Sequence, residues 1–218
     1  MQRYVDRALA PGSRVPSCVR ITQAGEMWLK PGGRALRFEA VEEFAVDEVA
    51  FSWRARFPIV PLVSLRVLDR YAAGEGQLEA RLFGLPLMRA RGQATAEGEA
   101  MRYLAELPWV PQAMAVNRQL EWRKLDLRTV EVATRVGLAR VAVRLEFNAE
   151  GDIVGASTDA RPRPEGKTIV PRPWGGVFAG YAVFGRIRVP RQAEVRWDLP
   201  EGSFTYWRGA VTSLELDS

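Results

Sequence analysis

An alternation of apolar and polar residues with a period of two recurs along most of this chain and constrains its fold more than any other feature. In residues 51–57, apolar side chains at every second position alternate with Ser52, Arg54 and Arg56, and residues 138–147 and 192–199 repeat the pattern. Such alternation is typical of β-strands with one face packed and the other in water. Roughly ten or more short strands at about ten-residue spacing predict a large antiparallel sheet.

One stretch in the middle of the chain, residues 96–114, has the spacing of an amphipathic helix instead. Its apolar residues recur three and four positions apart: Met101, Leu104, Ala105 and Leu107. Thr95 is a candidate N-cap, and Pro108 disfavours the helical conformation at the residue before it. The pattern therefore predicts a helix over 96–107.

These elements together predict an α+β fold that is mainly antiparallel β. A sheet this wide should twist, curl or split, and its apolar face needs a cover. The central helix over 96–107 and a short N-terminal helix over 2–10 are the available cover. We expect a single domain over 1–218, with strands in 19–94 and 119–216 forming one curved, half-barrel-like sheet around the central helix.

Glycine and proline mark the segments where the pattern is weakest. The strand expected over 19–29 has an interruption near Gly25, and 84–94 is either irregular strand or loop. Residues 161–173 contain four prolines and should be the longest irregular segment. The Pro-Trp-Gly-Gly segment at 173–176 indicates a stiff loop, either the rim or lid of a cavity or a turn that needs positive φ.

The composition excludes several classes of site. Histidine is absent, which excludes Ser-His-Asp and Cys-His nucleophiles, His-containing zinc sites and facial-triad iron sites. Cys18 is the only cysteine, so neither an intrachain disulfide nor a thiolate cluster is available. The densest acidic cluster, at 42–48, lacks the spacing of a calcium loop. We therefore expect neither a cofactor nor a metal.

The net charge is +5, and nearly all of the positive charge is carried by arginines, since only Lys30, Lys124 and Lys167 are lysines. The arginines are spread along the chain without a block of like charge, which favours a solvated strand face over a nucleic-acid surface. No apolar run reaches the length of a membrane span, and residues 1–12 lack the apolar core of a signal peptide. We expect a cytoplasmic protein; an additional upstream segment would allow a periplasmic or membrane-associated one.

Two features indicate a binding site. Arg102 and Glu106 lie one helical turn apart, either as an exposed ion pair or as a polar pair inside the sheet that orients a ligand head group. Trp109 either belongs to the core or forms the wall of a pocket. The candidate ligand-binding residues are Trp53, Arg102, Glu106, Trp109, Trp174, Tyr181 and Trp197.

Several motifs occur in a fixed order along the chain: FxWxA at 51–55, RYLAELPWVP at 102–111, PWGG at 173–176 before Tyr181, and EVRW at 194–197. In this combination the chain resembles an uncharacterised bacterial family, DUF6544 (earlier DUF6920), over nearly its whole length. The resemblance implies a shared fold and no particular activity. The expected shape is similar to that of periplasmic lipoprotein carriers and receptors of the Lol type.

Three functions are compatible with this reading. The first is non-enzymatic binding of a hydrophobic or lipid-like molecule in the concave face of the sheet. The second is a carboxylate-dependent enzyme acting on a small or sugar-like substrate, which needs two acids such as Glu106 and Glu194 to converge. The third is a structural domain, or an arginine-rich face that docks on an anionic surface. A helix that filled the sheet completely would leave no cavity at all.

Overall fold

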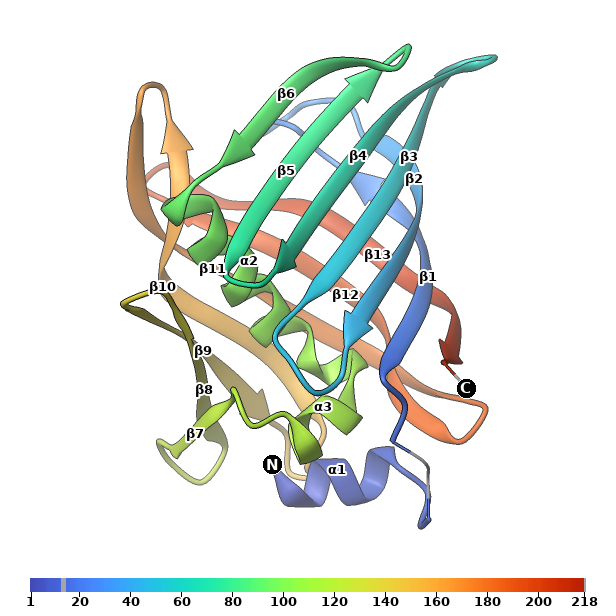
Figure 1. Cartoon of the computed structure of the whole chain (residues 1–218), viewed down its shortest axis with the longest axis vertical. Coiled ribbons are helices and arrows are strands. Elements are labelled where there is room, and N and C mark those ends of the chain that lie inside the picture. Colours follow the sequence, from blue (N-terminus) through green and yellow to red (C-terminus); the bar gives the residue numbers. More distant parts are fainter. Residues whose placement is uncertain (13–14, 218) are drawn as a thin grey trace.

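The computed structural model describes residues 1–12 and 15–217. In these residues, thirteen strands form one sheet in the order β6-β5-β4-β3-β2-β1-β13-β12-β11-β10-β9-β8-β7, and every neighbouring pair is antiparallel (Figure 1). The predicted fold class, a curved antiparallel sheet around a central helix, is confirmed.

The first meander consists of β1 (Cys18–Met27), β2 (Leu36–Ala45), β3 (Phe51–Val60), β4 (Val63–Ala72), β5 (Glu75–Leu82) and β6 (Leu85–Arg91). The second consists of β7 (Glu121–Lys124), β8 (Thr129–Val136), β9 (Ala139–Phe147), β10 (Ile153–Glu165), β11 (Thr168–Phe184), β12 (Ile187–Leu199) and β13 (Gly202–Leu216). The helices are α1 (Gln2–Ala8), α2 (Gln93–Glu106) and α3 (Pro111–Val116), with a 3-10 turn at Leu107–Trp109.

The two meanders are two arms of one bent sheet, joined where β1 pairs with β13. The chain passes from the outer strand of the first arm, β6, to the outer strand of the second, β7, through α2 and α3. Helix α2 thereby crosses the concave side and packs against β5 of one arm and against β9 and β10 of the other (Figure 1).

Burial follows the alternation of the sequence. In β3, Phe51, Trp53, Ala55 and Phe57 are buried on the concave side while Arg54 and Arg56 are exposed. On α2, Leu104 is fully buried, and Leu107 just beyond it is buried as well. The helix ends before Pro108, as predicted, but it begins at Gln93 after Gly92, whose φ of 99° favours glycine, so Thr95 is not the N-cap.

The four-proline segment was expected to be irregular, and that expectation is wrong. It forms the distal half of the β10–β11 hairpin, in which Pro162 is opposite Pro171. Strand β9 pairs only with 153–157 of β10, and β12 pairs only from Trp174 of β11 onward. The distal hairpin is therefore two-stranded with two free edges, where a missing proline N–H costs no ladder hydrogen bond.

The glycines expected to interrupt strands lie inside them. A Cβ at Gly25 would be 2.1 Å from the Arg208 carbonyl oxygen, and Cβ atoms at Gly175 and Gly176 would each be 2.5 Å from a neighbouring strand's carbonyl oxygen. The segment at 173–176 is thus part of strand β11, without positive φ, and the loop predicted there is wrong. Residues 84–94 likewise form β6 and the start of α2.

Candidate functional site

A cavity of about 490 Å³ lies between α2 and the concave face, bounded by residues of both arms. Its wall is predominantly apolar, and aromatic side chains contribute much of it: Trp53, Trp109, Trp174, Phe178, Trp197, Tyr206 and Trp207. Helix α2 therefore leaves part of the hollow unfilled. The cavity falls in the size range of small-molecule sites.

The indole N–H groups of three of these tryptophans are bonded inside the protein. Trp53 donates to Gln23 Oε1 at 2.8 Å, Trp109 to the Pro190 carbonyl at 2.9 Å, and Trp174 to the Tyr206 hydroxyl at 3.0 Å. Because their polar atoms are satisfied, these side chains offer carbon surface to the cavity.

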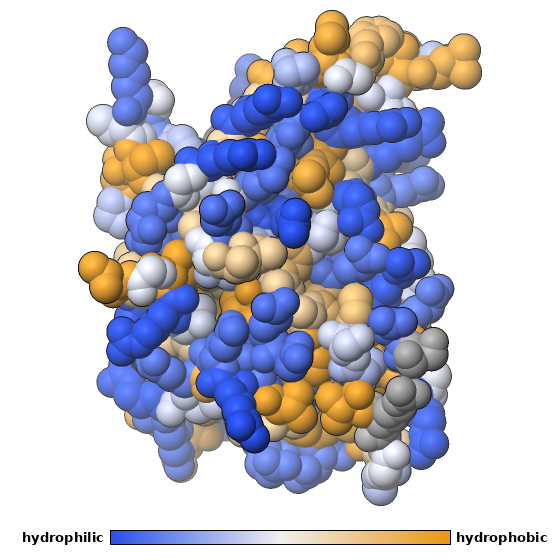
Figure 2. All heavy atoms as spheres, in the orientation of Figure 1, coloured by the Kyte–Doolittle hydropathy of each residue, from blue (hydrophilic) through white to orange (hydrophobic). Residues whose placement is uncertain are grey.

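The apolar wall continues outward to one end of the molecule. Leu29, Leu87 and Met88 line the cavity, and Leu29 is 73% exposed. The β3–β4 and β5–β6 turns at this end carry Leu62 and Phe83, which are also exposed, and Figure 2 shows apolar side chains gathered at the upper end of the molecule. An apolar molecule would thus meet apolar surface from the outside to the cavity.

The inner polar part of the site is organised by Arg102 of α2. Its Nη2 donates to Glu42 Oε1 at 2.7 Å, its Nη1 to Asp69 Oδ2 at 2.6 Å and its Nε to Glu106 Oε1 at 2.9 Å. The guanidinium carbon also lies 4.9 Å from the ring centroid of Phe51. Arg102 is therefore a buried cation bonded to three carboxylates, and the alternative of an exposed pair with Glu106 is wrong.

A second cation, Arg161 of β10, also lines the cavity. Its guanidinium carbon is 4.2 Å from the ring centroid of Trp174, and its Nη2 is 3.7 Å from Glu99 Oε1. Both side chains are about nine-tenths buried. Glu99 belongs to α2, one turn before Arg102, so the helix supplies three of the charged groups.

Burial is the main cause of the raised pKa values of two of the carboxyls, those of Glu42 and Glu99. It raises the pKa of Glu42 well above the ordinary value, and the nearby Glu106 raises it further while Arg102 opposes the shift. Burial likewise raises the pKa of Glu99, with Asp69 adding to the shift. These groups therefore hold protons more strongly than exposed carboxyls do, as expected for paired acids in a poorly solvated site.

The raised pKa of Glu99 predicts a pH-dependent effect of Glu99→Gln. A carboxyl whose folded-state pKa is raised contributes stability below its unfolded pKa and loses that contribution as pH rises through the folded pKa. Glutamine is neutral throughout, so we expect the variant to gain stability relative to wild type between pH 5 and pH 8. Urea denaturation of both proteins at the two pH values measures this, and a difference independent of pH would contradict it.

Sequence reasoning missed Glu42, Asp69, Glu99 and Arg161. The alternation does contain a signal for two of them. In β2, the buried positions are 38, 40, 42 and 44, so Glu42 is an acid at an inward position. Asp69 likewise occupies an inward position of β4 before Tyr71. A charged residue in register with an apolar face indicates an interior polar site.

Six of the seven candidate residues line the cavity: Trp53, Arg102, Glu106, Trp109, Trp174 and Trp197. Tyr181 lies outside the cavity lining. Its hydroxyl donates to the Ile153 carbonyl at 2.7 Å, and its ring makes an edge contact with Tyr4 of α1. Strand β11 is long and extends past the cavity. Gly176 lines the cavity, whereas Tyr181, five residues further along the strand, lies beside α1. Whether the six residues bind a ligand stays a prediction.

The acids proposed for catalysis do not converge. Glu194 borders the cavity, but its carboxylate pairs with exposed Arg208 at 3.2 Å, while the neighbouring Trp207 points inward. Because successive residues of a strand face opposite sides, this ion pair lies on the outer face. Glu106 instead bonds to Arg102 inside.

The arginines on the outer face are largely matched with acids. Glu43 pairs with Arg20 and Arg54, and Glu131 pairs with Arg123 and Arg140. These partially exposed pairs are typical of a solvated strand face.

The described residues contain neither a metal-binding cluster nor a membrane-spanning helix. No group of three or more acidic or cysteine side chains there is arranged to hold a metal ion. No helix in the same residues is both long and apolar enough to cross a membrane.

The sequence model of a family of unknown function, DUF6544, matches residues 1–209, so the chain belongs to that family. No curated protein matches it. Three solved structures share the fold at low sequence identity. A LolA-superfamily protein from Nitrosomonas europaea has a TM-score of 0.50 and 9% identity, with 99% of this chain and 91% of that one covered.

The second is a DUF1329-family protein from Desulfovibrio piger, with a TM-score of 0.51, 12% identity and coverage of 98% and 88%. The third is a domain of a putative outer-membrane lipoprotein-sorting protein from Vibrio parahaemolyticus, with a TM-score of 0.50, 8% identity and coverage of 93% and 86%. At these identities the likeness shows a shared fold.

Proposed function

We propose that this DUF6544-family protein binds a hydrophobic or lipid-like molecule in the cavity between α2 and the concave face, without chemical conversion. The observation that carries the proposal is an apolar, aromatic-lined cavity of about 490 Å³ that both arms and the helix build together. The fold shared with a LolA-superfamily protein and a lipoprotein-sorting domain supports a carrier or binding role.

The direct test is extraction of freshly purified protein with organic solvent, followed by mass spectrometry. A fluorescent apolar probe titrated into delipidated protein gives an independent measurement. We expect either a co-purifying lipid-like molecule or saturable probe binding. Absence of both would remove the proposal.

Blocking the cavity locates the binding. Val67 of β4 lines it, so Val67→Trp should fill part of the space and weaken probe binding about tenfold or more, equivalent to about 1.4 kcal/mol. Leu68→Trp is the matched control, because Leu68 is the next residue of the same strand and faces the other side. Titration of the probe into both variants measures the effect, and equal affinities would contradict binding in this cavity.

A further inference from the structure

The polar part of the cavity contains acceptor atoms without donors. No N–H or hydroxyl group of the described residues donates to the buried oxygens Asp69 Oδ1, Glu99 Oε2 and Glu106 Oε2. Their side-chain neighbours are other carboxyls, which pair as Glu99 with Asp69 and Glu42 with Glu106. All three side chains line the cavity, and Asp69 and Glu99 are more than nine-tenths buried. A buried acceptor without a donor is costly, so these atoms indicate that a donor is to be supplied at this place.

The charges of this region do not balance by themselves. Four carboxyls, Glu42, Asp69, Glu99 and Glu106, face two guanidinium groups, those of Arg102 and Arg161. If all four carboxyls were ionised, the negative charges would exceed the positive charges by two. Such an excess in a poorly solvated site is relieved either by protons or by a cation.

We propose that the ligand carries a protonated amine on an apolar tail, and that the ammonium group sits among Asp69, Glu99 and Glu106. This inference rests on the proposed function, since it names the head group of the molecule in the same cavity. An ammonium group has three donors and no acceptor, which matches three acceptor oxygens. Its charge also offsets the excess of acid.

Other head groups fit this place less well. A carboxylate would add an acceptor and a negative charge beside acids that already exceed the cations. Both nearby cations already have acidic partners: three of the five N–H groups of Arg102 donate to carboxylates, and Arg161 lies 3.7 Å from Glu99. A hydroxyl brings one donor for three acceptors and no charge.

Binding of an ammonium group should release protons. The titratable groups that face this place are Glu42 from β2, Asp69 from β4, Glu99 and Glu106 from α2, and Tyr206 from β13, and the fixed charges are those of Arg102 and Arg161. A cation favours the ionised form of nearby carboxyls. Protons held between Glu99 and Asp69, and between Glu42 and Glu106, should therefore leave when the amine binds.

The test compares three probes with the same twelve-carbon tail, dodecylamine, dodecan-1-ol and dodecanoate, in calorimetric titrations of the delipidated protein at pH 7. Each titration is run in two buffers of different ionisation enthalpy, so that proton release is measured with affinity. We expect the amine to bind at least about tenfold more tightly than the carboxylate, with protons released only by the amine.

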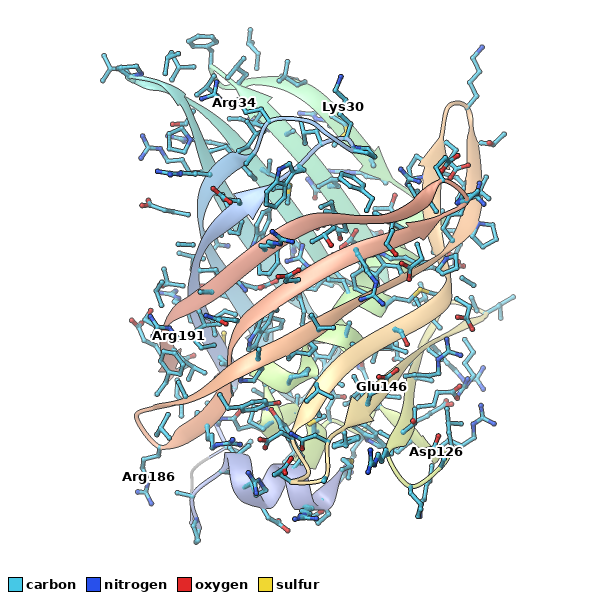
Figure 3. The ribbon with its side chains drawn as sticks, turned by 180° about the vertical axis from the view of Figure 1, so that it is seen from behind. Lys30, Arg34, Asp126, Glu146, Arg186 and Arg191 are labelled. Atoms are coloured by element: carbon cyan, nitrogen blue, oxygen red, sulfur yellow. The ribbon has the colours of Figure 1, made fainter. Side chains whose placement is uncertain are left out.

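Asp69→Asn and Glu99→Gln should each reduce the preference for the amine and the proton release, and denaturation curves establish that both variants fold. Glu146→Gln is the control, because Glu146 is exposed on β9, on the face seen from behind in Figure 3. Val67→Trp should weaken binding of the amine if the amine binds in the cavity, and should leave its affinity unchanged if the amine binds to acids on the surface.

The outcomes distinguish the two proposals. Equal affinity for all three probes, tighter binding of the carboxylate, or amine binding that Val67→Trp leaves intact would overturn the amine head group. In the first two cases apolar binding in the cavity would still stand. Failure of all three probes to bind would remove the proposed function together with the head group.

Discussion

Arg102→Met should lower the free energy of unfolding by about 3–5 kcal/mol, the usual cost of removing one partner from a buried ion pair. Arg102 bonds to Glu42, Asp69 and Glu106, and only 14% of its side chain is exposed. Methionine keeps the apolar stem but leaves these carboxyls without their shared cation. Urea denaturation of the variant and of wild type at pH 7 measures the loss.

The pH dependence of that loss checks its cause. Without Arg102, the ionised forms of Glu42 and Glu106 become less favourable, so their folded-state pKa values rise further. The destabilisation should therefore shrink as pH falls and these carboxyls take up protons. Arg123→Met is the control, since Arg123 is exposed and its partner Glu131 keeps a second arginine, Arg140; we expect a change within about 0.5 kcal/mol. A loss at Arg102 no larger than the control's would contradict a buried, organising cation.

Leu104→Ala should destabilise the protein by about 2–5 kcal/mol, the range measured for leucine truncations in packed cores. Leu104 is fully buried on α2, inside the hollow of the sheet. Truncation leaves a cavity, and the strands and helix around it can relax only partly to fill it. Thermal or urea denaturation gives the change in unfolding free energy.

Leu138→Ala is the matched control for Leu104→Ala. Leu138 is fully exposed in the turn between β8 and β9, so the same chemical change should alter stability by no more than about 0.5 kcal/mol. Equal effects at the two positions would mean that α2 does not pack into the sheet as described.

The sequence predicts the faces of the strands well because alternation is a local property. The inward positions of β3 and the buried side of α2 could be read from neighbouring residues alone. The same local rule, applied to acids as well as to apolar residues, would have placed Glu42 and Asp69 inside. Charged residues are usually outward-facing, so an acid at an inward position is easily overlooked in the sequence.

Other features depend on distant parts of the chain and left no local signal. The β1–β13 pairing brings Val19 opposite Leu216, and close contact with Arg208 is what requires Gly25 to lack a side chain. The four-proline segment can be part of a hairpin because neither β9 nor β12 pairs with it. Tyr181 has an aromatic side chain like those of the cavity, but only the tertiary structure shows that it contacts α1 instead.

Crystallography with a brominated ligand shows directly whether the ligand binds between α2 and the concave face. Of the three twelve-carbon probes, the tightest binder is prepared with a terminal bromine and crystallised with the delipidated protein, and the bromine is located by its anomalous scattering. We expect a bromine peak between α2 and the concave face, within the aromatic wall that includes Trp109 and Trp197. A peak found only on the outer face of the sheet, at saturating ligand, would contradict binding in the cavity.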